Sequence, residues 1–157
     1  MNRHALIESV HGAAQTQPRI YSYRHTVSFE DTNVVGNVYF ACYVSWQGRC
    51  RELFLRDYAP DVIDDLRSDL RLVTLSVSCE YFAELRVLDD VEIRMSLAHL
   101  RQHRIGLIFN YVLQRGHSET LVARGNQEVG CMRGTAGGLL PTAIPRSLAA
   151  ALAQFAT

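Results

Sequence analysis

The chain is organised around residues 29–56, which read FEDTNVVGNVYFACYVSWQGRCRELFLR. This stretch predicts the end of a strand, a tight turn at Gly36, and then one long helix over residues 38–57 with Asn37 as its N-cap. Apolar side chains recur along the helix in a stripe that is wide for a surface helix, so we expect burial on several sides. Gly48 in mid-helix costs about 1 kcal/mol relative to alanine, and close packing against a sheet or another helix would justify it.

The turn brings polar groups to the N-terminus of the predicted helix. Backbone N–H groups there have no partner within the helix, and the helix dipole is positive at that end. This arrangement suits a ligand carbonyl that must carry developing negative charge. The alternative is a well-capped core helix without a site. Asp31 fits both, because in an extended segment it faces the same way as Asn33 and can serve as a base or as a turn cap.

Alternating and periodic patterns place further elements on both sides of this stretch. Residues 20–30 alternate as a half-buried strand. Residues 58–70 are expected to form an acidic connection with one short helical turn, and residues 134–138 a flexible break. Pro145 is expected to open a C-terminal helix at its N1 position. Four more strands are expected over residues 71–85, 91–101, 104–115 and 119–133.

The length of 157 residues predicts one domain. Residues 1–19 are expected to form an N-terminal extension, residues 20–135 the domain itself, and residues 136–157 a tail with a short helix. The order of strand, long helix and four strands predicts the α+β class, with an antiparallel sheet wrapped around one helix. One helix cannot cover both faces and every edge of such a sheet, so we expect self-association through an edge strand or a sheet face.

The composition excludes several classes of function. The formal net charge is zero, which gives no electrostatic reason to bind nucleic acid or an anionic membrane. All 16 basic residues are arginine, which excludes Schiff-base and lysine general-base chemistry. No run approaches the ~18 apolar residues of a membrane span. The first residues lack the apolar core of a secretory signal, so a cytoplasmic location is expected.

No metal or other cofactor is expected. The four cysteines form no C-x-x-C pair and are interpreted as buried apolar thiols. His99 and His103 lie in a strand-like region, where their spacing of four residues spans about 13 Å and is too long for one metal ion. Both are expected at the surface or in a turn.

The order of elements and the turn FEDTNVVGNVYFACY resemble the hotdog fold, and within it the 4-hydroxybenzoyl-CoA thioesterase family. The family pattern is approximately F-x-D-x-D-x-x-G-[HI]-V-[NYF]-x-x-x-Y, and the resemblance covers residues 20–135. The positions that fit the pattern are Phe29, Asp31, Gly36, Val38 and Tyr43.

One departure from the pattern is informative. Asn33 occupies the position that usually carries the catalytic aspartate, and asparagine is neither a nucleophile nor a general base at neutral pH. This substitution, Tyr43 and the run WQGRCRE over residues 46–52 resemble the thioesterases of enediyne polyketide clusters. The resemblance implies hydrolysis of a β-keto or β-hydroxy polyene thioester on the acyl-carrier protein of an iterative polyketide synthase, followed in some cases by decarboxylation to a methyl ketone. It also implies a dimer of dimers.

The same resemblance implies roles for individual residues. Asn33, Tyr43 and Arg51 match functional positions of the subfamily. Phe40 would supply a backbone N–H that polarises the carbonyl, next to the turn at Gly36. Asn33 would add a side-chain N–H or position the water, or else it serves only the turn. Tyr43 would hold the water or the thioester, or else it packs in the core.

Arg51 lies about fourteen residues into the predicted helix, roughly 20 Å from its N-terminus. It would therefore serve a partner's site across a dimer interface, or bind a β-keto or carboxylate group deeper in a tunnel. The alternative is a salt bridge with Glu52 or Asp57. The residues expected to line a tunnel for the acyl chain are Tyr21, Tyr23, Phe40 and Val44.

Three rival functions stay open from the sequence. An acyl-CoA thioesterase would use Asp31 or Glu52 as its base. A non-catalytic acyl-thioester binder fits the missing aspartate, although no basic patch or DNA-binding segment accompanies it. A hotdog dehydratase needs a histidine with an Asp or Glu at its site, and residues 29–56 contain no histidine.

Overall fold

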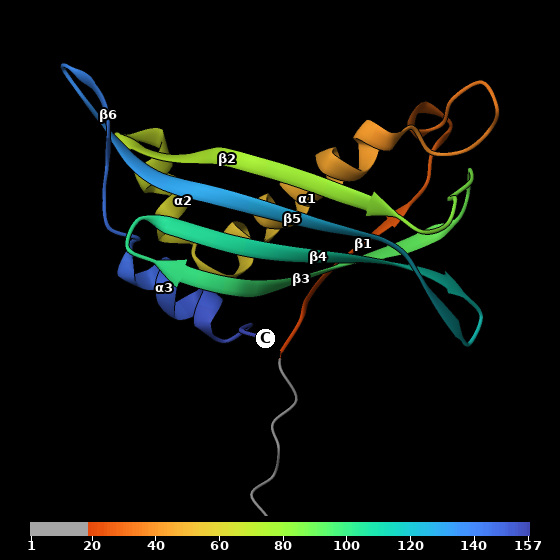
Figure 1. Cartoon of the computed structure of the whole chain (residues 1–157). Helices are drawn as coiled ribbons and strands as arrows, with labels where there is room; N and C mark the ends of the chain where they lie inside the picture. Colours follow the sequence, from red (N-terminus) through yellow and green to blue (C-terminus); the bar gives the residue numbers. More distant parts are fainter. Residues whose placement is uncertain (1–18) are drawn as a thin grey trace, which may run out of the picture.

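The computed structural model describes residues 19–157, so the predicted N-terminal extension lies outside the described residues except for Arg19. One six-stranded sheet has the order β1-β3-β4-β5-β2, with β6 paired to β5 (Figure 1). All pairings are antiparallel. The strands are β1 (Tyr21–Thr26), β2 (Leu70–Tyr81), β3 (Asp90–Arg101), β4 (Arg104–Arg115), β5 (Ser118–Thr135) and β6 (Gly138–Pro141).

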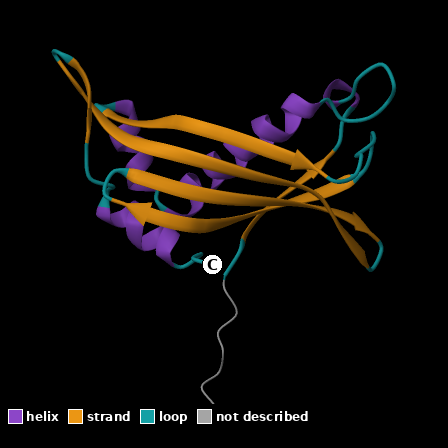
Figure 2. Cartoon of the chain, in the orientation of Figure 1, coloured by secondary structure: helices purple, strands orange, loops and turns teal. Residues whose placement is uncertain are grey.

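The helices lie together on one face of the sheet (Figure 2). The longest, α1, crosses that face, and α2 follows it directly. The helical elements are the 3-10 turn η1 (Phe29–Asp31), α1 (Phe40–Tyr58), α2 (Pro60–Arg67) and α3 (Arg146–Ala153). This arrangement confirms the predicted α+β class with an antiparallel sheet wrapped around one long helix. No helix between residues 19 and 157 is both long and apolar enough to cross a membrane.

The core lies between α1 and the inner face of the sheet. Alternate residues of β3 and β4 face the helix, and the largest of them are at most 1% exposed, namely Ile93, Met95, Phe109 and Tyr111. The residues that α1 buries are Tyr43, Trp46, Gln47, Cys50, Phe54 and Leu55. Burying one large apolar side chain contributes about 1.5–3 kcal/mol, so the contact of α1 with the sheet is a main source of stability.

The helix begins two residues later than predicted, and Asn37 is not its N-cap. Tyr39 occupies the N-cap position, and no side chain caps the helix. The backbone N–H of Val38 donates to the carbonyl of Leu85 at 2.9 Å. This bond keeps the preceding segment extended against the residues that follow β2, so helical geometry starts only at Phe40.

Four further features differ from the prediction. The segment after α1 forms a two-turn helix, α2, instead of a single turn. β2 ends at Tyr81 because the next two backbone N–H groups both donate to one carbonyl of β5 and bend the chain. The predicted flexible break is a hairpin in which β5 runs to Thr135 and pairs with β6. Pro145 is the N-cap of α3 and not its first residue.

The sheet leaves an apolar strand, β2, at one edge. Leu75, Val77 and Tyr81 of this strand are 40–45% exposed.

Gly48 lies on α1 between Gln47 and Arg51, both of which reach β2 or its neighbour β5. A Cβ atom on Gly48 would meet nothing within 4 Å. The close packing predicted for this glycine is therefore wrong within a single chain.

Candidate active site

Asn33 lies in the tight turn that precedes α1. The N–H of Gly36 donates to the Asn33 carbonyl at 2.9 Å, and Gly36 has a φ of +87°, which glycine adopts without a Cβ clash. The predicted turn at Gly36 is confirmed, and its N–H is used within the turn. Asn33 Oδ1 accepts the N–H of Val35 at 3.0 Å. Residues 19–157 provide no acceptor for Asn33 Nδ2, so this amide N–H₂ is left to donate elsewhere.

The first two backbone N–H groups of α1 form a donor pair next to this turn. The N–H of Tyr39 donates to the Asp31 carbonyl at 2.8 Å, and that of Cys42 to the Tyr39 carbonyl at 2.9 Å. Between them, the N–H groups of Phe40 and Ala41 have no acceptor in the described part of the chain. They sit at the positive end of the helix dipole, where an oxyanion is stabilised.

A pocket of about 170 Å³ opens at this end of α1. Its lining residues are Asn37, Val38, Phe40, Tyr43, Tyr81, Ala83 and Glu84. The hydroxyl of Tyr81 donates to the Phe40 carbonyl at 2.9 Å. This bond fixes one wall of the pocket to the first turn of the helix.

Tyr43 lies mostly in the core, with one edge on this pocket. The residue is 3% exposed. Its ring packs on Trp46, Tyr81 and Tyr111 with centroid distances of 5.0–5.3 Å. Burial raises the pKa of the Tyr43 hydroxyl. The hydroxyl is therefore a neutral group on a buried ring, which favours the packing role over a catalytic one.

Asp31 uses its carboxylate to hold the turn. Oδ2 accepts hydrogen bonds at 2.9 Å from His25 Nε2 and from both the backbone N–H and the hydroxyl of Ser28. Burial raises the pKa of Asp31, but the bonds from Ser28 and His25 outweigh it and bring the pKa below its usual value. A carboxylate stabilised as the anion is a weak base, so the turn-capping alternative is the one that fits the structure.

His25 lies on β1, outside residues 29–56, and its side chain reaches the site. Its Nε2 bonds Asp31, and its Nδ1 lies 3.3 Å from the hydroxyl of Tyr23. The sequence argument against a dehydratase was that no histidine lies within residues 29–56, and that argument is wrong because the fold supplies one. Both ring nitrogens are nevertheless engaged within the protein, so His25 offers neither of them to a substrate.

Arg51 lies far from the helix N-terminus and pairs with no acid. It comes eleven residues after Phe40, which is roughly 16 Å along the helix. Its Nη1 donates to Thr74 Oγ1 and Gln127 Oε1, each at 3.2 Å. Burial lowers the pKa of Arg51. Within residues 19–157 no carboxylate forms a salt bridge with it, so the predicted alternative of a bridge to Glu52 or Asp57 is wrong.

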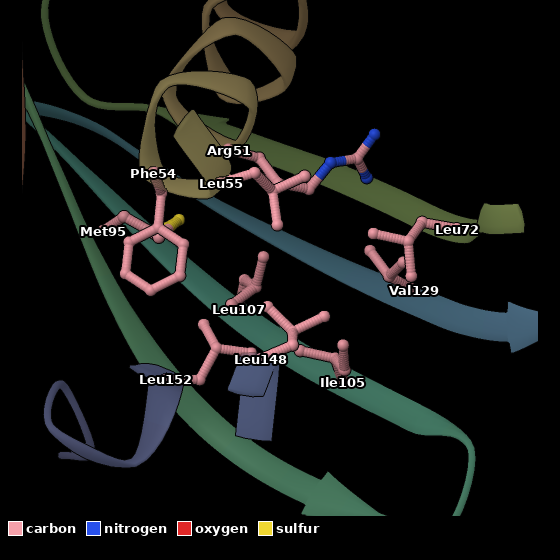
Figure 3. Close-up of a pocket in the computed structure, with 10 residues that line it drawn as sticks. All are labelled: Arg51, Phe54, Leu55, Leu72, Met95, Ile105, Leu107, Val129, Leu148 and Leu152. Atoms are coloured by element: carbon pink, nitrogen blue, oxygen red, sulfur yellow. The ribbon is translucent and has the colours of Figure 1, made fainter. Parts of the chain in front are cut away.

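An apolar cavity lies beside the aliphatic part of Arg51, between α1, α3 and the sheet (Figure 3). The guanidinium points away from it, and the other lining residues are Phe54, Leu55, Leu72, Met95, Ile105, Leu107, Val129, Leu148 and Leu152. The free space is about 10 Å³, which is near the room that one water molecule needs. An acyl chain would therefore enter only if α1 or α3 shifted.

The structure does not bring the four expected tunnel residues together. Tyr21 packs on Phe54 at the other end of α1, and its hydroxyl donates to Asp57. Phe40 and Val44 share one helix face near the site, being four residues apart. Tyr23 belongs to the hydrogen bonds around His25.

Glu52 and the groups able to bind a metal lie apart from this site or are missing from the described residues. Glu52 is exposed on the outer side of α1, far along the helix from the donor pair. No group of three or more His, Cys, Asp or Glu side chains in residues 19–157 is placed to hold a metal ion.

Sequence reasoning missed two contributors to the site. Alternation predicts a half-buried strand that contains His25, but the contact of His25 with Asp31 needs the bend at η1. Tyr81 was placed in a strand without a role. Its bond to Phe40 depends on how β2 crosses the helix, which local patterns do not specify.

Comparisons with known proteins agree with the fold and identify the family. The model of the thioesterase-like superfamily matches residues 27–152. The dynemicin thioesterase, whose crystal structures concern polyene binding, is 46% identical, with a TM-score of 0.86 and coverage of 88% of this chain and 99% of that one. A comparison with curated protein sequences finds no match.

Two more distant structures share the fold. The 1,4-dihydroxy-2-naphthoyl-CoA thioesterase Slr0204 from Synechocystis is 20% identical, with a TM-score of 0.70 and coverage of 86% and 96%. The 4-hydroxybenzoyl-CoA thioesterase bound to 4-hydroxybenzoyl-CoA is 15% identical, with a TM-score of 0.74 and coverage of 85% and 99%. The likeness to the dynemicin enzyme confirms the resemblance to enediyne polyketide thioesterases. The chain belongs to the thioesterase-like superfamily and is a thioester hydrolase with the hotdog fold.

Proposed function

We propose that the protein releases a β-keto or β-hydroxy polyene chain from the acyl-carrier protein of an iterative enediyne polyketide synthase. The observation that carries the proposal is the donor pair of Phe40 and Ala41 beside Asn33, a residue that cannot accept a proton at neutral pH. The polyene named for the dynemicin thioesterase supports the substrate class.

The donor pair would receive the thioester carbonyl oxygen. When water adds to the carbonyl carbon, the oxygen becomes an oxyanion, and each preorganised donor contributes about 3 kcal/mol. Asn33 Nδ2 would donate to the same oxygen or orient the water. The C–S bond then breaks, and the carrier-protein thiolate takes up the proton that the water gives up.

Turnover is expected to be slow because neither carboxylate that the sequence suggests as a base is placed to act, and Glu84, which lines the pocket, accepts from Asn37 Nδ2 at 3.1 Å. The Asp31 carboxylate is held by Ser28 and His25, and Glu52 is exposed well along α1. Hydrolysis would therefore rest on carbonyl polarisation and positioned water. General-base catalysis typically contributes 10²–10⁴-fold, and this contribution would be missing.

The polar and apolar surroundings of Arg51 suit the remainder of the substrate. Its guanidinium has neutral partners only. Because it lies roughly 16 Å along α1 from the donor pair, it would bind the β-keto oxygen or the product carboxylate in the active site of a partner chain. The cavity beside it would widen to accept an apolar chain. A β-keto acid product can lose CO₂ to give a methyl ketone.

We further propose that the chain self-associates through β2, as a dimer of dimers. The unpaired edge of β2 and its exposed apolar residues support this assembly. Arg51 donates to Thr74 of β2, so in such a dimer it would lie near the partner's active site.

The test is thiol release from a β-ketoacyl carrier protein, with mass spectrometry of the acyl product. We expect free β-keto acid or methyl ketone from the wild type and a loss of about 100-fold in Asn33→Ala. An enoyl product would show a dehydratase. Binding of the loaded carrier protein without release would show a non-catalytic binder, and either result would overturn the proposal.

A further inference from the structure

Three side chains form one hydrogen-bonded chain that runs from β1 to the active-site turn. The hydroxyl of Tyr23 lies 3.3 Å from His25 Nδ1, and His25 Nε2 lies 2.9 Å from Asp31 Oδ2. We call Tyr23, His25 and Asp31 the β1 network. The thioesterase chemistry described above uses none of its members directly.

The chemistry of Asp31 sets the direction of the bond that ends the β1 network. A carboxylate only accepts, so His25 Nε2 carries an N–H that donates to Asp31 Oδ2. Nδ1 faces the Tyr23 hydroxyl, so both ring nitrogens are used within the protein. An imidazole bonded at both nitrogens orients its neighbour.

Packing keeps the imidazole in place. The ring of His25 lies on Trp46 with centroids 4.6 Å apart, and Trp46 packs in turn on Tyr43. The side chains of His25 and Asp31 are only 17% and 12% exposed. The network therefore connects β1, η1 and α1 through one partly buried aromatic layer.

The β1 network ends at Asp31, which positions the catalytic groups. Asp31 accepts the N–H of Tyr39 through its backbone carbonyl at 2.8 Å, directly before the donor pair of α1. It also stands two residues before Asn33. A shift of Asp31 would thus move Asn33 relative to the N–H groups of Phe40 and Ala41.

We propose that His25 is a positioning residue for thioester hydrolysis, which holds the turn with Asn33 in register with the helix N-terminus. This inference rests on the proposed function. A displacement of about 1 Å costs on the order of 100-fold in rate, and the network contacts no part of the apolar cavity that would bind the chain. Loss of the imidazole is expected to lower kcat by about 10- to 100-fold and to leave KM nearly unchanged.

The matched control is a second histidine–carboxylate pair, which lies within the sheet and is partly exposed. His99 Nε2 lies 3.1 Å from Glu128 Oε2. Glu128 follows Gln127, whose side chain reaches Arg51 on the helix side, so the His99 pair lies on the opposite face of the sheet. Removing His99 disturbs a similar ion pair without touching the active-site turn.

The experiment compares His25→Ala, His25→Gln and His99→Ala in steady-state thiol release from a β-ketoacyl carrier protein, with melting temperatures recorded. We expect a fall in kcat for His25→Ala and recovery of most of it in His25→Gln, because the glutamine amide can donate to Asp31 in place of Nε2. His99→Ala should keep the wild-type kcat. If His25→Ala does not fold, Tyr23→Phe removes one hydroxyl and should lower kcat several-fold.

Two outcomes would overturn this inference. One is a wild-type kcat in His25→Ala or, if that variant does not fold, in Tyr23→Phe. The other is an equal loss in His25→Gln and His99→Ala, which would indicate a general effect of stability. Asn33→Ala separates this inference from the proposed function. Full activity in Asn33→Ala would refute the proposed function. Loss of activity in Asn33→Ala, together with wild-type activity in His25→Ala, would refute only the role of His25.

Discussion

At the scale of single residues, Asn33 combines two tasks in one amide. Its Oδ1 caps the turn by accepting the N–H of Val35, and its Nδ2 is left for the substrate. The isosteric change Asn33→Asp keeps the first task and removes the second. We expect kcat to fall by about 100-fold and the melting temperature to stay the same, as measured by thiol release and thermal unfolding.

The opposite result would be equally clear. If Asn33→Asp released the acyl chain faster than the wild type, the carboxylate would be acting as a base or nucleophile, as the family pattern implies. The site would then be the usual aspartate-dependent site of the family, in which asparagine has replaced the acid. Asn33→Ala, which loses both the cap and the donor, is the control for damage to the turn.

Asp31 contributes stability that depends on pH. Its pKa is lowered in the folded protein, so its contribution is present above the usual pKa of an aspartate, near 4, and is lost as pH falls through the folded value. We expect Asp31→Asn to lower the free energy of unfolding by about 1–3 kcal/mol at pH 7. Urea denaturation should show this difference shrinking toward pH 3, whereas a constant difference would contradict the assignment.

At the scale of elements, α1 packs on β5 through one close approach. A Cβ atom on Gly125 would lie 1.9 Å from Gln47 Nε2 and 3.2 Å from the carbonyl oxygen of Ser78. We expect Gly125→Ala to destabilise the protein by about 1–3 kcal/mol in urea denaturation, because the buried amide of Gln47 has to move. In Gly125→Ala with Gln47→Ala, the loss should be smaller than the sum of the two single changes.

Gly137→Ala is the matched control, since a Cβ there meets its nearest atom only at 4.0 Å. Its effect should stay within about 0.5 kcal/mol. Strict additivity of the changes at Gly125 and Gln47 would show that the helix approaches the sheet differently.

At the scale of elements, it is also clear which parts of the fold and of the site can be predicted from local sequence. Alternation and helical periodicity give the strands and α1, and Gly36 gives the turn, because these depend on neighbours along the chain. The start of α1 was misplaced because the bond from Val38 to Leu85 joins distant segments. The partners of Arg51 come from β2 and β5, and that of Asp31 from β1, so they depend on strand order and register.

At the scale of the whole molecule, the two faces of α1 are unequal. One face is covered by the sheet, while the side toward β2 leaves Val77 and Tyr81 more than 40% exposed. A Cβ atom added to Gly48 on that side would meet nothing within 4 Å, although glycine in mid-helix costs about 1 kcal/mol. A second chain placed along β2 would cover these groups and would give the glycine the close contact that a single chain lacks.

This assembly predicts the effect of a charge on the β2 edge. Val77→Arg would bury a guanidinium in the proposed interface, so we expect the mass measured by light scattering to fall to half that of the wild-type assembly or less. Leu139→Arg, at a site that is 51% exposed on β6, adds the same charge away from β2 and should keep the wild-type mass. Thiol release should fall only in Val77→Arg, because Arg51 would no longer reach the partner's site. Identical masses for both variants would place the contact between copies elsewhere on the molecule.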